Sequence, residues 1–506
     1  MKSEIRRVGS NYARLFAGAL CGLLTTRILV EFGIEVFNLY TLVILGVGVG
    51  AMAREYIRAT VTPHLAKQAT DKADPSAFSK SYSSAFGFSS ISAVFGAVAL
   101  LVLAANISSF AIGTVTLYSA QLFIIMRAIS ILATITMTPY VAALPIFGRF
   151  EKSNAILFSE RLIDVSAAAF TLLLTLYWPE VDVIICFGLT STILTYGYLG
   201  AVISGEKAAG GKLVPSIRRM QPILIKKLFV TSGFVLLFVI SMNLFIRFDT
   251  LYINANYGTV ITVAFGVTVQ LMGYARQFTA ALSNNLDAVI ATQHVESTAE
   301  SIGQMHKTVQ FNTYAQSFFS LMSLSILALN VKEIILLWLG NKMDNPTLLQ
   351  AAEIFTIIAM IAMSFRAFSE SFISSLQGIG RNRGLALTMV ISAIANVVIL
   401  LAFMGVAVTD PPYLLVVLLF AVAFCVTHAI AIPLLFSHAM NFPIVAIYGE
   451  QARLLFVLML SYAAGYYVLE WMAIETGSTR IIISSMMVVM IFGAELGLKI
   501  WMSRRA

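Results

Sequence analysis

Charged residues are scarce in this sequence. Asp, Glu, Lys and Arg make up 11% of its 506 residues, whereas a soluble protein carries about 25%. Hydrophobic residues account for 59%, and the mean hydropathy is +0.87. These values exclude an ordinary soluble domain and predict an all-α polytopic membrane protein, because lipid-exposed backbone must satisfy its own hydrogen bonds in helices.

Cysteine is nearly absent, and Cys21, Cys186 and Cys425 lie far apart inside apolar runs. An odd number at such spacing supports neither a disulfide framework nor a metal site, so we expect small buried hydrophobes. The chain also lacks a Gly-x-x-x-x-Gly-Lys-Ser/Thr loop, which cradles nucleotide phosphates. ATP hydrolysis within this chain is therefore not expected, and neither a metal nor an organic cofactor is predicted.

The net charge of +8 comes from basic residues spread through short loops between apolar segments. That distribution is typical of the positive charge that orients membrane helices, not of a surface that binds nucleic acid. We therefore expect no nucleic acid as a partner, and we expect membrane lipids around the chain.

Runs of about 20 mostly apolar residues can cross a bilayer as helices. Fourteen stretches of this sequence meet that criterion. They cover residues 11–31, 37–55, 83–105, 113–137, 160–178, 182–203, 228–248, 260–283, 308–329, 350–376, 384–405, 413–436, 452–471 and 479–500. A shorter apolar stretch at 334–339 is expected to lie in the membrane interface.

The loops between these spans alternate in charge. One set is rich in Lys and Arg, with Arg218 and Arg219 in its longest loop, and the other set holds acidic residues such as Glu180 and Asp182. Because basic loops stay on the cytoplasmic side, both termini are expected in the cytoplasm.

The longest basic loop divides the sequence into two halves with weak mutual similarity. Ala53 and Arg54 end the second span, and Ala275 and Arg276 recur in the same setting of the eighth. We therefore predict a duplicated six-helix unit whose two copies share one orientation. The expected organisation is an N-terminal lobe at 1–203, a basic cytoplasmic linker with an interfacial helix at 204–227, a C-terminal lobe at 228–438 and two additional helices at 439–506.

Three short motifs stand where predicted spans end. They are TRILVEFG at 26–33, followed by FNLY at 37–40; RFDTLYI at 247–253; and QGIGR at 377–381, followed by Asn396. Together they resemble the polysaccharide-transporter branch of the multidrug/oligosaccharidyl-lipid/polysaccharide exporter superfamily, although Asn38 stands where that family usually has glycine. The resemblance covers most of the chain, and its fourteen-helix count is similar to that of lipid II flippases.

The resemblance implies two lobes that alternate between inward-open and outward-open states. They would move a glycan linked to undecaprenyl diphosphate, such as an O-antigen or a similar repeat unit, to the outer leaflet. The place implied is a bacterial cytoplasmic membrane, in the synthesis of a cell-envelope polysaccharide or lipopolysaccharide. Other membrane proteins of polysaccharide assembly are candidate partners. No covalent chemistry is required, so we do not expect an enzyme.

Arginine is the basic residue of the span interiors. The six arginines within predicted spans or near their ends are Arg27, Arg54, Arg127, Arg247, Arg276 and Arg366. Each costs roughly 2.5–3.5 kcal/mol to insert unless it faces water, protein or an anion. Guanidinium binds a diphosphate bidentately and keeps its proton in a dry cavity. We therefore interpret part of this set as a path for an anionic substrate.

The candidates for a substrate diphosphate-binding cavity are Arg127, Arg276, Arg54 and Arg27. Arg127 lies near the middle of its span with no acidic residue within one turn. Lipid II flippases carry cavity arginines on helices one, two and eight, and Arg27, Arg54 and Arg276 are the positions here that look like them. Snorkelling to the membrane surface stays open as the alternative for Arg27, Arg54 and Arg247.

Two further arginines are interpreted as members of structural charge pairs. Arg366 precedes Glu370 by four residues, so both lie on one helical face. Arg161 precedes Asp164 by three residues and has the same relation to it.

Ion coupling needs a titratable or cation-binding group inside the membrane. Asp249 is the candidate carboxylate, with Asn243 and Asn396 as neutral oxygen donors. Helix seven holds an acidic cation ligand in some relatives of the resembled family. Na⁺ and H⁺ are both candidate coupling ions, and the alternative is that Asp249 is a surface carboxylate at a helix end.

A cation-coupled multidrug exporter of the same superfamily is the main competing function. Such a pump would favour acidic and aromatic residues in its cavity, and the excess of intramembrane arginine argues against it. A scaffold would not need Arg127 in the middle of the membrane, whereas uncoupled scrambling stays open.

Overall fold

The structure is a computed structural model that describes residues 2–70, 76–209, 213–283, 286, 290, 299–340, 345–403, 411–472 and 477–503. Every regular element in these ranges is helical. The chain forms two compact units. The first comprises Met1–Asn243 and Thr250–Thr262, and the second comprises Leu244–Asp249 and Val263–Ala506.

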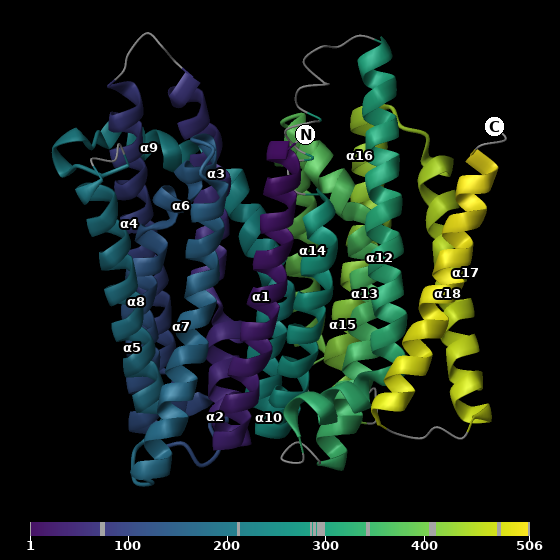
Figure 1. Ribbon diagram of the computed structural model, residues 1–506, viewed down its shortest axis with the longest axis horizontal. Helices are drawn as coiled ribbons and strands as arrows, with labels where there is room; N and C mark the ends of the chain where they lie inside the picture. Colours follow the sequence, from purple (N-terminus) through teal and green to yellow (C-terminus); the bar gives the residue numbers. More distant parts are fainter. Residues whose placement is uncertain are drawn as a thin grey trace. The chain divides into compact units, whose positions relative to one another are not determined.

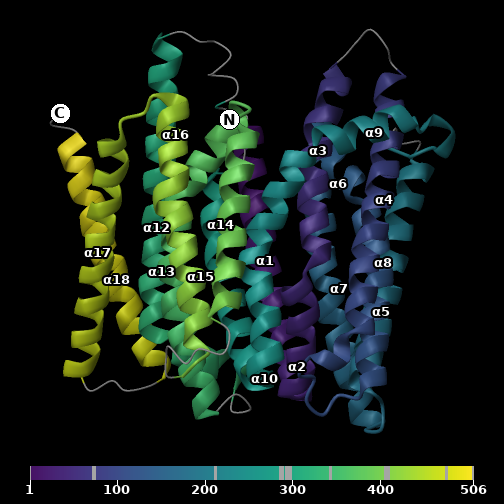
Figure 2. The ribbon, with the colours of Figure 1, turned by 180° about the vertical axis from the view of Figure 1, so that it is seen from behind.

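The first unit is a bundle of long helices, in which α4, α5, α7 and α8 run alongside one another (Figure 1). The short helix α9 lies across the end of α4 in both views (Figures 1 and 2). The helices of this unit are α1 (Lys2–Phe32), α2 (Ile34–Tyr40), α3 (Val49–Thr70), α4 (Ala77–Ala105), α5 (Leu117–Thr136), α6 (Thr138–Ile146), α7 (Phe150–Tyr177), α8 (Val183–Ala208) and α9 (Pro222–Thr231).

The second unit is a bundle in which α12 packs against α13, α17 and α18 (Figure 1). Helix α10 (Gly233–Ser283) contributes to both units. The other helices of the second unit are α12 (Ala299–Leu339), α13 (Pro346–Gly378), α14 (Asn382–Ala402), α15 (Leu414–Cys425), α16 (Ile432–Met440), α17 (Ile444–Trp471) and α18 (Ser478–Ser503).

The predicted all-α polytopic fold is confirmed. Among the described residues, 12 helical segments are long and apolar enough to cross a membrane. One of them, Gly233–Ala275, holds two predicted spans, because α10 breaks at Gly258 (φ 79°, ψ −171°). Helix α7 is a further 28-residue helix over the predicted span 160–178, and its charged residues Glu160, Arg161 and Asp164 set it apart from the 12. Each of the fourteen predicted spans therefore contains helix over the residues that the structure describes.

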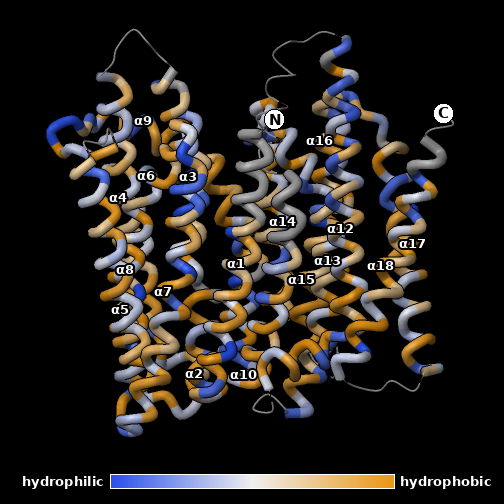
Figure 3. Tube along the Cα trace, viewed as in Figure 1, coloured by the Kyte–Doolittle hydropathy of each residue, from blue (hydrophilic) through white to orange (hydrophobic). Residues whose placement is uncertain are grey.

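The outer faces of both bundles are apolar. Large hydrophobic side chains such as Phe95, Leu176, Val422 and Met459 are more than half exposed. In Figure 3 the helices are largely orange and white, and blue residues gather in the segment that leads into α9. Because a soluble protein rarely exposes such continuous apolar surface, these faces are suited to contact lipid. The chain is a multi-pass membrane protein.

The predicted span 37–55 is interrupted. A π-helix over Thr41–Val47 follows α2, and Gly48 then adopts φ 48° before α3 begins. A side chain is strained at positive φ, so glycine marks the turn between the two helices. The second predicted span is therefore two helices, and α3 continues beyond it to Thr70.

Two buried asparagines link the segment Thr250–Thr262 of α10 to the rest of the first unit. The Asn254 Nδ2 atom donates to Asn38 Oδ1 at 3.1 Å, and the Ala111 N–H donates to Asn254 Oδ1 at 2.8 Å. Asn38 Nδ2 in turn donates to the Ala111 carbonyl at 2.6 Å. Asn38 stands where the resembled family usually has glycine. Its side chain has a structural role here, because it bonds to Asn254 in the segment Thr250–Thr262.

The described part of the linker is docked on α4. Tyr82 Oη donates to the Leu213 carbonyl at 3.0 Å, and the Gln221 N–H donates to Ser84 Oγ at 2.9 Å. The linker and α9 therefore belong to the first unit, whose boundary falls inside α10. Residues 210–212 of the predicted linker lie outside the described residues.

Candidate functional site: a charge cluster on helix α7

Arg127 is held by two polar groups from other helices. Its Nη1 atom lies 3.1 Å from Asp164 Oδ1 on α7 and donates to Ser191 Oγ on α8 at 2.9 Å. Ser191 Oγ also donates to Asp164 Oδ1 at 3.2 Å, which closes a triangle. The side chains of Arg127 and Asp164 are 15% and 18% exposed. The guanidinium is thus fixed inside the first unit.

Arg54 on α3 pairs with a second carboxylate of α7, Glu160. It makes an ion pair with Glu160 through Nη1, and its Nε donates to the Gly50 carbonyl at 3.3 Å. Glu160 and Asp164 are four residues apart, so their side chains lie on one face of α7. Two arginines from α3 and α5 therefore converge on one turn of α7. We call Arg54, Arg127, Glu160, Asp164 and Ser191 the α7 charge cluster.

The cluster is neutral in sum but retains hydrogen-bond donors. A guanidinium has five N–H donors, and both recorded bonds of Arg127 use Nη1. Among the described residues, Nε and Nη2 of Arg127 and Nη2 of Arg54 have no further partner. The carboxylates therefore orient the two arginines and cancel their net charge, while leaving donors for a ligand.

The other arginines in or near predicted spans have different settings. Arg27 pairs with Glu31 one turn along α1 at 2.8 Å, while its buried Nη1 has no hydrogen-bond partner among the described residues. Arg247 has an interaction partner. The side chain of Arg276 lies outside the described residues, although its backbone belongs to α10.

The predicted structural pairs are placed differently from each other. Arg366 Nε lies 3.2 Å from Glu370 Oε2, as the spacing of four residues on α13 predicts. Asp164, the predicted partner of Arg161, instead pairs with Arg127. Arg161 is exposed, and a Cβ atom at Gly18 of α1 would lie 3.9 Å from its Cγ atom. Helical spacing correctly described a local pair but missed a contact between helices.

Asp249 and Asn396 form a second buried polar group, in the second unit. Asp249 is 0% exposed and Asn396 is 1% exposed. Asn396 on α14 is the polar neighbour of the Asp249 carboxylate, but the two side chains do not meet hydrogen-bonding geometry. All four of their polar atoms lack a hydrogen-bond partner among the described residues. Asp249 is therefore not a surface carboxylate.

Asn243 is engaged elsewhere. Its Nδ2 atom donates to the Val239 carbonyl one turn back on α10, at 2.7 Å. Asn243 and Asp249 are six residues apart on this helix, which places them about 120° apart around its axis at 3.6 residues per turn. The helix therefore does not present both side chains to one ligand.

Two members of the α7 charge cluster were not anticipated from the sequence. Glu160 and Ser191 were not among the predicted site residues. One available signal was the spacing of Glu160 and Asp164, which puts two carboxylates on one face of a helix that must cross a membrane. Such a face requires cationic partners from neighbouring helices, and α3 and α5 supply them.

Solved structures of transporters share this architecture. The lipid II flippase MurJ in an inward closed conformation matches with a TM-score of 0.62 at 13% identity, covering 98% of this chain and 99% of that chain. An inward-facing multidrug resistance MATE family transporter of the MOP superfamily matches with a TM-score of 0.63 at 12% identity, covering 86% of this chain and 98% of that chain. The chain has the fold of these transporters.

A third similar structure is a MATE protein in complex with MaL6, with a TM-score of 0.63 at 11% identity over 86% of this chain and 96% of that chain. No family model matches the chain, and no curated protein sequence matches it. The structural likeness is thus a likeness of fold. It agrees with the fold that the sequence motifs implied.

Proposed function

We propose that this protein is a flippase that moves a polyprenyl-diphosphate-linked oligosaccharide from the inner to the outer leaflet of a bacterial cytoplasmic membrane. The termini would lie in the cytoplasm, and the transport would be a physical movement without covalent chemistry. The single observation that carries the proposal is the α7 charge cluster, in which two carboxylates one turn apart on α7 position arginines from α3 and α5.

The length of the structural match supports a flippase over a drug exporter. The MurJ match covers 98% of this chain, so it necessarily includes α17 and α18. The two MATE matches each cover 86% of this chain although they cover nearly all of the other chain. This chain is therefore closer in extent to a fourteen-helix flippase than to a shorter MATE exporter.

The α7 charge cluster suits a phosphate-bearing cargo. A diphosphate accepts several charge-assisted hydrogen bonds, and an arginine fork meets it with two parallel donors. In the resting state Glu160 and Asp164 occupy part of each fork. A diphosphate would compete with these carboxylates, so binding is an exchange of one anion for another. Such an exchange permits release, because the carboxylates return to the arginines when the cargo leaves.

Asp249 and Asn396 would carry the coupling ion. Three oxygen atoms, both of the Asp249 carboxylate and one of the Asn396 amide, are buried without a hydrogen-bond partner among the described residues. Hard cations such as Na⁺ prefer oxygen ligands, and a bound cation would neutralise a carboxylate that is costly to bury alone. The residues therefore fit Na⁺, and a proton on Asp249 is the alternative. Asn243 is not part of this group.

Reconstitution tests the function directly. The purified full-length protein is reconstituted into liposomes that contain a fluorescent polyprenyl-diphosphate disaccharide lipid. A membrane-impermeant quencher then reports the fraction of this lipid in the outer leaflet. The proposal predicts translocation of this lipid and no accumulation of ethidium in inverted vesicles. The reverse result, with ethidium transported and the diphosphate lipid left in place, would establish the multidrug alternative.

A further inference from the structure

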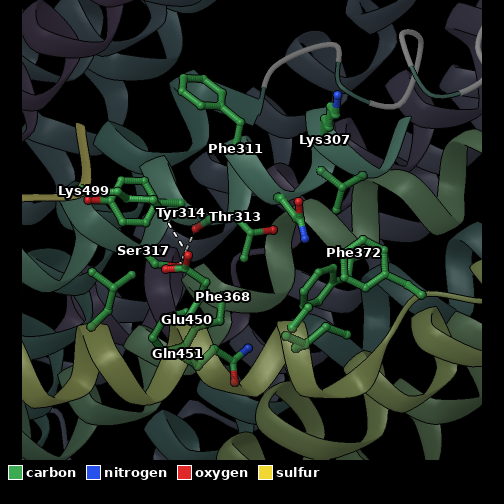
Figure 4. A pocket seen from close by; sticks show the side chains of 16 residues that line it. Lys307, Phe311, Thr313, Tyr314, Ser317, Phe368, Phe372, Glu450, Gln451 and Lys499 are labelled. Atoms are coloured by element: carbon green, nitrogen blue, oxygen red, sulfur yellow. Dashed lines mark hydrogen bonds and ion pairs between the residues drawn. The ribbon is translucent and has the colours of Figure 1, made fainter. Parts of the chain in front are cut away.

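A second candidate site lies within the second unit. A cavity of about 330 Å³ opens near the end of this unit where α12 and α17 begin and α18 ends (Figure 4). This volume is at the low end of the range of small-molecule pockets, about 300–1,000 Å³. Its apolar wall consists of Phe311, Phe368, Phe372, Phe442, Ile447 and Leu454.

Three polar atoms in the wall of this cavity lack partners. The Thr313 hydroxyl, the Gln451 Nε2 donor and the Glu450 Oε2 acceptor are buried and have no hydrogen bond among the described residues. Gln451 is only 4% exposed. Buried polar atoms are nearly always satisfied in native proteins. A donor, a hydroxyl and a carboxylate oxygen left open beside one cavity therefore point to a ligand with complementary groups.

The wall around these atoms is held by ion pairs between helices. Lys499 on α18 lies 3.1 Å from Glu450 Oε1 and also 3.1 Å from the centre of the Tyr314 ring. Tyr314 Oη donates to Glu495 Oε2 at 2.5 Å, and Arg453 pairs with Glu495 at 2.9 Å. The Oε1 atom of Glu450 is thus occupied, and its Oε2 atom is the one left for a ligand.

The polar groups select the chemistry of the occupant. Gln451 and Thr313 can donate to a phosphate, and Lys307 adds positive charge on a different side of the cavity from Glu450 (Figure 4). Glu450 Oε2 requires a donor, which an ammonium supplies. The phenylalanines require an apolar chain. One molecule that combines phosphate, primary ammonium and apolar chain is a phosphoethanolamine lipid.

We propose that this cavity binds the headgroup and the first part of one acyl chain of a phosphoethanolamine glycerophospholipid. The phosphate accepts from Gln451 and Thr313, and the ammonium donates to Glu450. The lipid joins α12, α13 and α17 and is distinct from the transported cargo. This inference does not depend on the proposed function, because lipid binding is measured without transport.

Lipid titration of the purified full-length protein, followed by native mass spectrometry, tests the site. Dioleoylphosphatidylethanolamine is compared with dioleoylphosphatidylcholine, whose trimethylammonium has no N–H donor, and with dioleoylphosphatidylglycerol, which has no ammonium. Loss of a hydrogen bond to a charged group weakens binding by about tenfold or more. We therefore expect the ethanolamine lipid to bind at least about tenfold more tightly than the other two.

Variants locate the binding. Gln451→Met removes a donor to the phosphate at nearly constant size, so it should weaken the binding of all three lipids. Ala446→Trp fills the cavity and should abolish their binding. Gln316→Met makes the same change at a buried glutamine that does not line this cavity, and it should keep the affinity of the unchanged protein for each lipid. Thermal unfolding of each variant confirms that it is folded before the titration.

Other outcomes overturn the proposal. Equal binding of the three lipids, or unchanged affinities in both Gln451→Met and Ala446→Trp, would show that the cavity does not bind this lipid. Displacement of the bound lipid by polyprenyl diphosphate would assign the cavity to the cargo, and displacement by ethidium would assign it to an organic cation.

Discussion

At the scale of single residues, arginines in the membrane-spanning helices of this protein are oriented by carboxylates. The Arg127 guanidinium is fixed by Asp164 and Ser191, so its orientation is set before any ligand arrives. Pre-orientation lowers the entropy that binding must overcome. Asp249 differs, because its neighbour Asn396 is a neutral amide and neither carboxylate oxygen has a hydrogen-bond partner among the described residues. The first arrangement suits an anionic ligand and the second suits a cation.

Replacing Asp249 tests the coupling site. Asp249→Asn removes the charge that would bind Na⁺ or a proton, so translocation should lose its response to an imposed ion gradient while slow equilibration between leaflets continues. The measurement is quencher-accessible lipid in liposomes with and without a Na⁺ or pH gradient. Glu180→Gln, an exposed charge removal, is the matched control and should keep the response. A gradient response that survives in Asp249→Asn would remove Asp249 from the coupling site.

Single residues also show where sequence reasoning ends. The pair of Arg366 and Glu370 follows from helical spacing alone, because its members are one turn apart. The partner of Arg127 is 37 positions away on another helix, so its discovery requires the packing of α5 against α7. The burial of Asp249 has the same origin, because its position near a span end left both an ion site and a surface carboxylate open, and the packing around it excludes solvent.

At the scale of elements, the break in α10 depends on backbone conformation. Gly258 has φ 79° and ψ −171°, a region that only glycine adopts readily. A Cβ atom at this position would meet no atom within 4 Å. Any effect of a side chain here therefore comes from backbone strain and not from crowding.

Substitution of this glycine should be costly. Gly258→Ala is expected to destabilise the protein by about 1–3 kcal/mol, the cost of a residue held in a sparsely populated backbone region. The control is Gly273→Ala on the same helix, where a Cβ atom also meets nothing within 4 Å and φ is not positive, and it should be neutral or slightly stabilising. Reversible unfolding in mixed micelles measures both. Equal stability of the two variants would contradict the account of the break.

A second element is the linker before α9, which substitutions on α4 are expected to detach from that helix. Tyr82→Phe combined with Ser83→Ala and Ser84→Ala removes the hydrogen bonds to Leu213, Ser216 and Gln221. Each such bond contributes about 1 kcal/mol, so trypsin should cut after Arg218 or Arg219 at least tenfold faster. Ser92→Ala, whose hydroxyl bonds only within its own helix, is the control. An unchanged cleavage rate would mean that the linker is held by its apolar contacts.

At the scale of the whole molecule, apolar run length was sufficient to predict the helices. Run length did not predict two breaks, and each has a physical cause. A π-helix and Gly48 divide the second predicted span, and α10 runs through two predicted spans with a break at Gly258. The predicted division at the linker stays a prediction. The chain passes between the two compact units within α10, where Thr250–Thr262 belong to the first unit and Asn254 bonds to Asn38. Hydropathy describes how much of a helix is apolar and carries no information about which neighbours it will bond.

The central claim is that Arg127 is positioned for a phosphate and is not merely the partner of Asp164. A charge reversal of the pair, Arg127→Asp with Asp164→Arg, separates these roles, because it preserves an ion pair between α5 and α7 but moves the guanidinium to the other helix. The matched control reverses the local pair on α13, Arg366→Glu with Glu370→Arg.

The decisive measurement is the rate of polyprenyl-diphosphate glycan translocation by the reversed protein in liposomes, with thermal unfolding recorded on the same sample. The account predicts a folded protein whose rate falls at least tenfold, the equivalent of about 1.4 kcal/mol, while the reversed α13 pair retains its rate. A reversed Arg127 and Asp164 pair that transports at the wild-type rate would contradict the account.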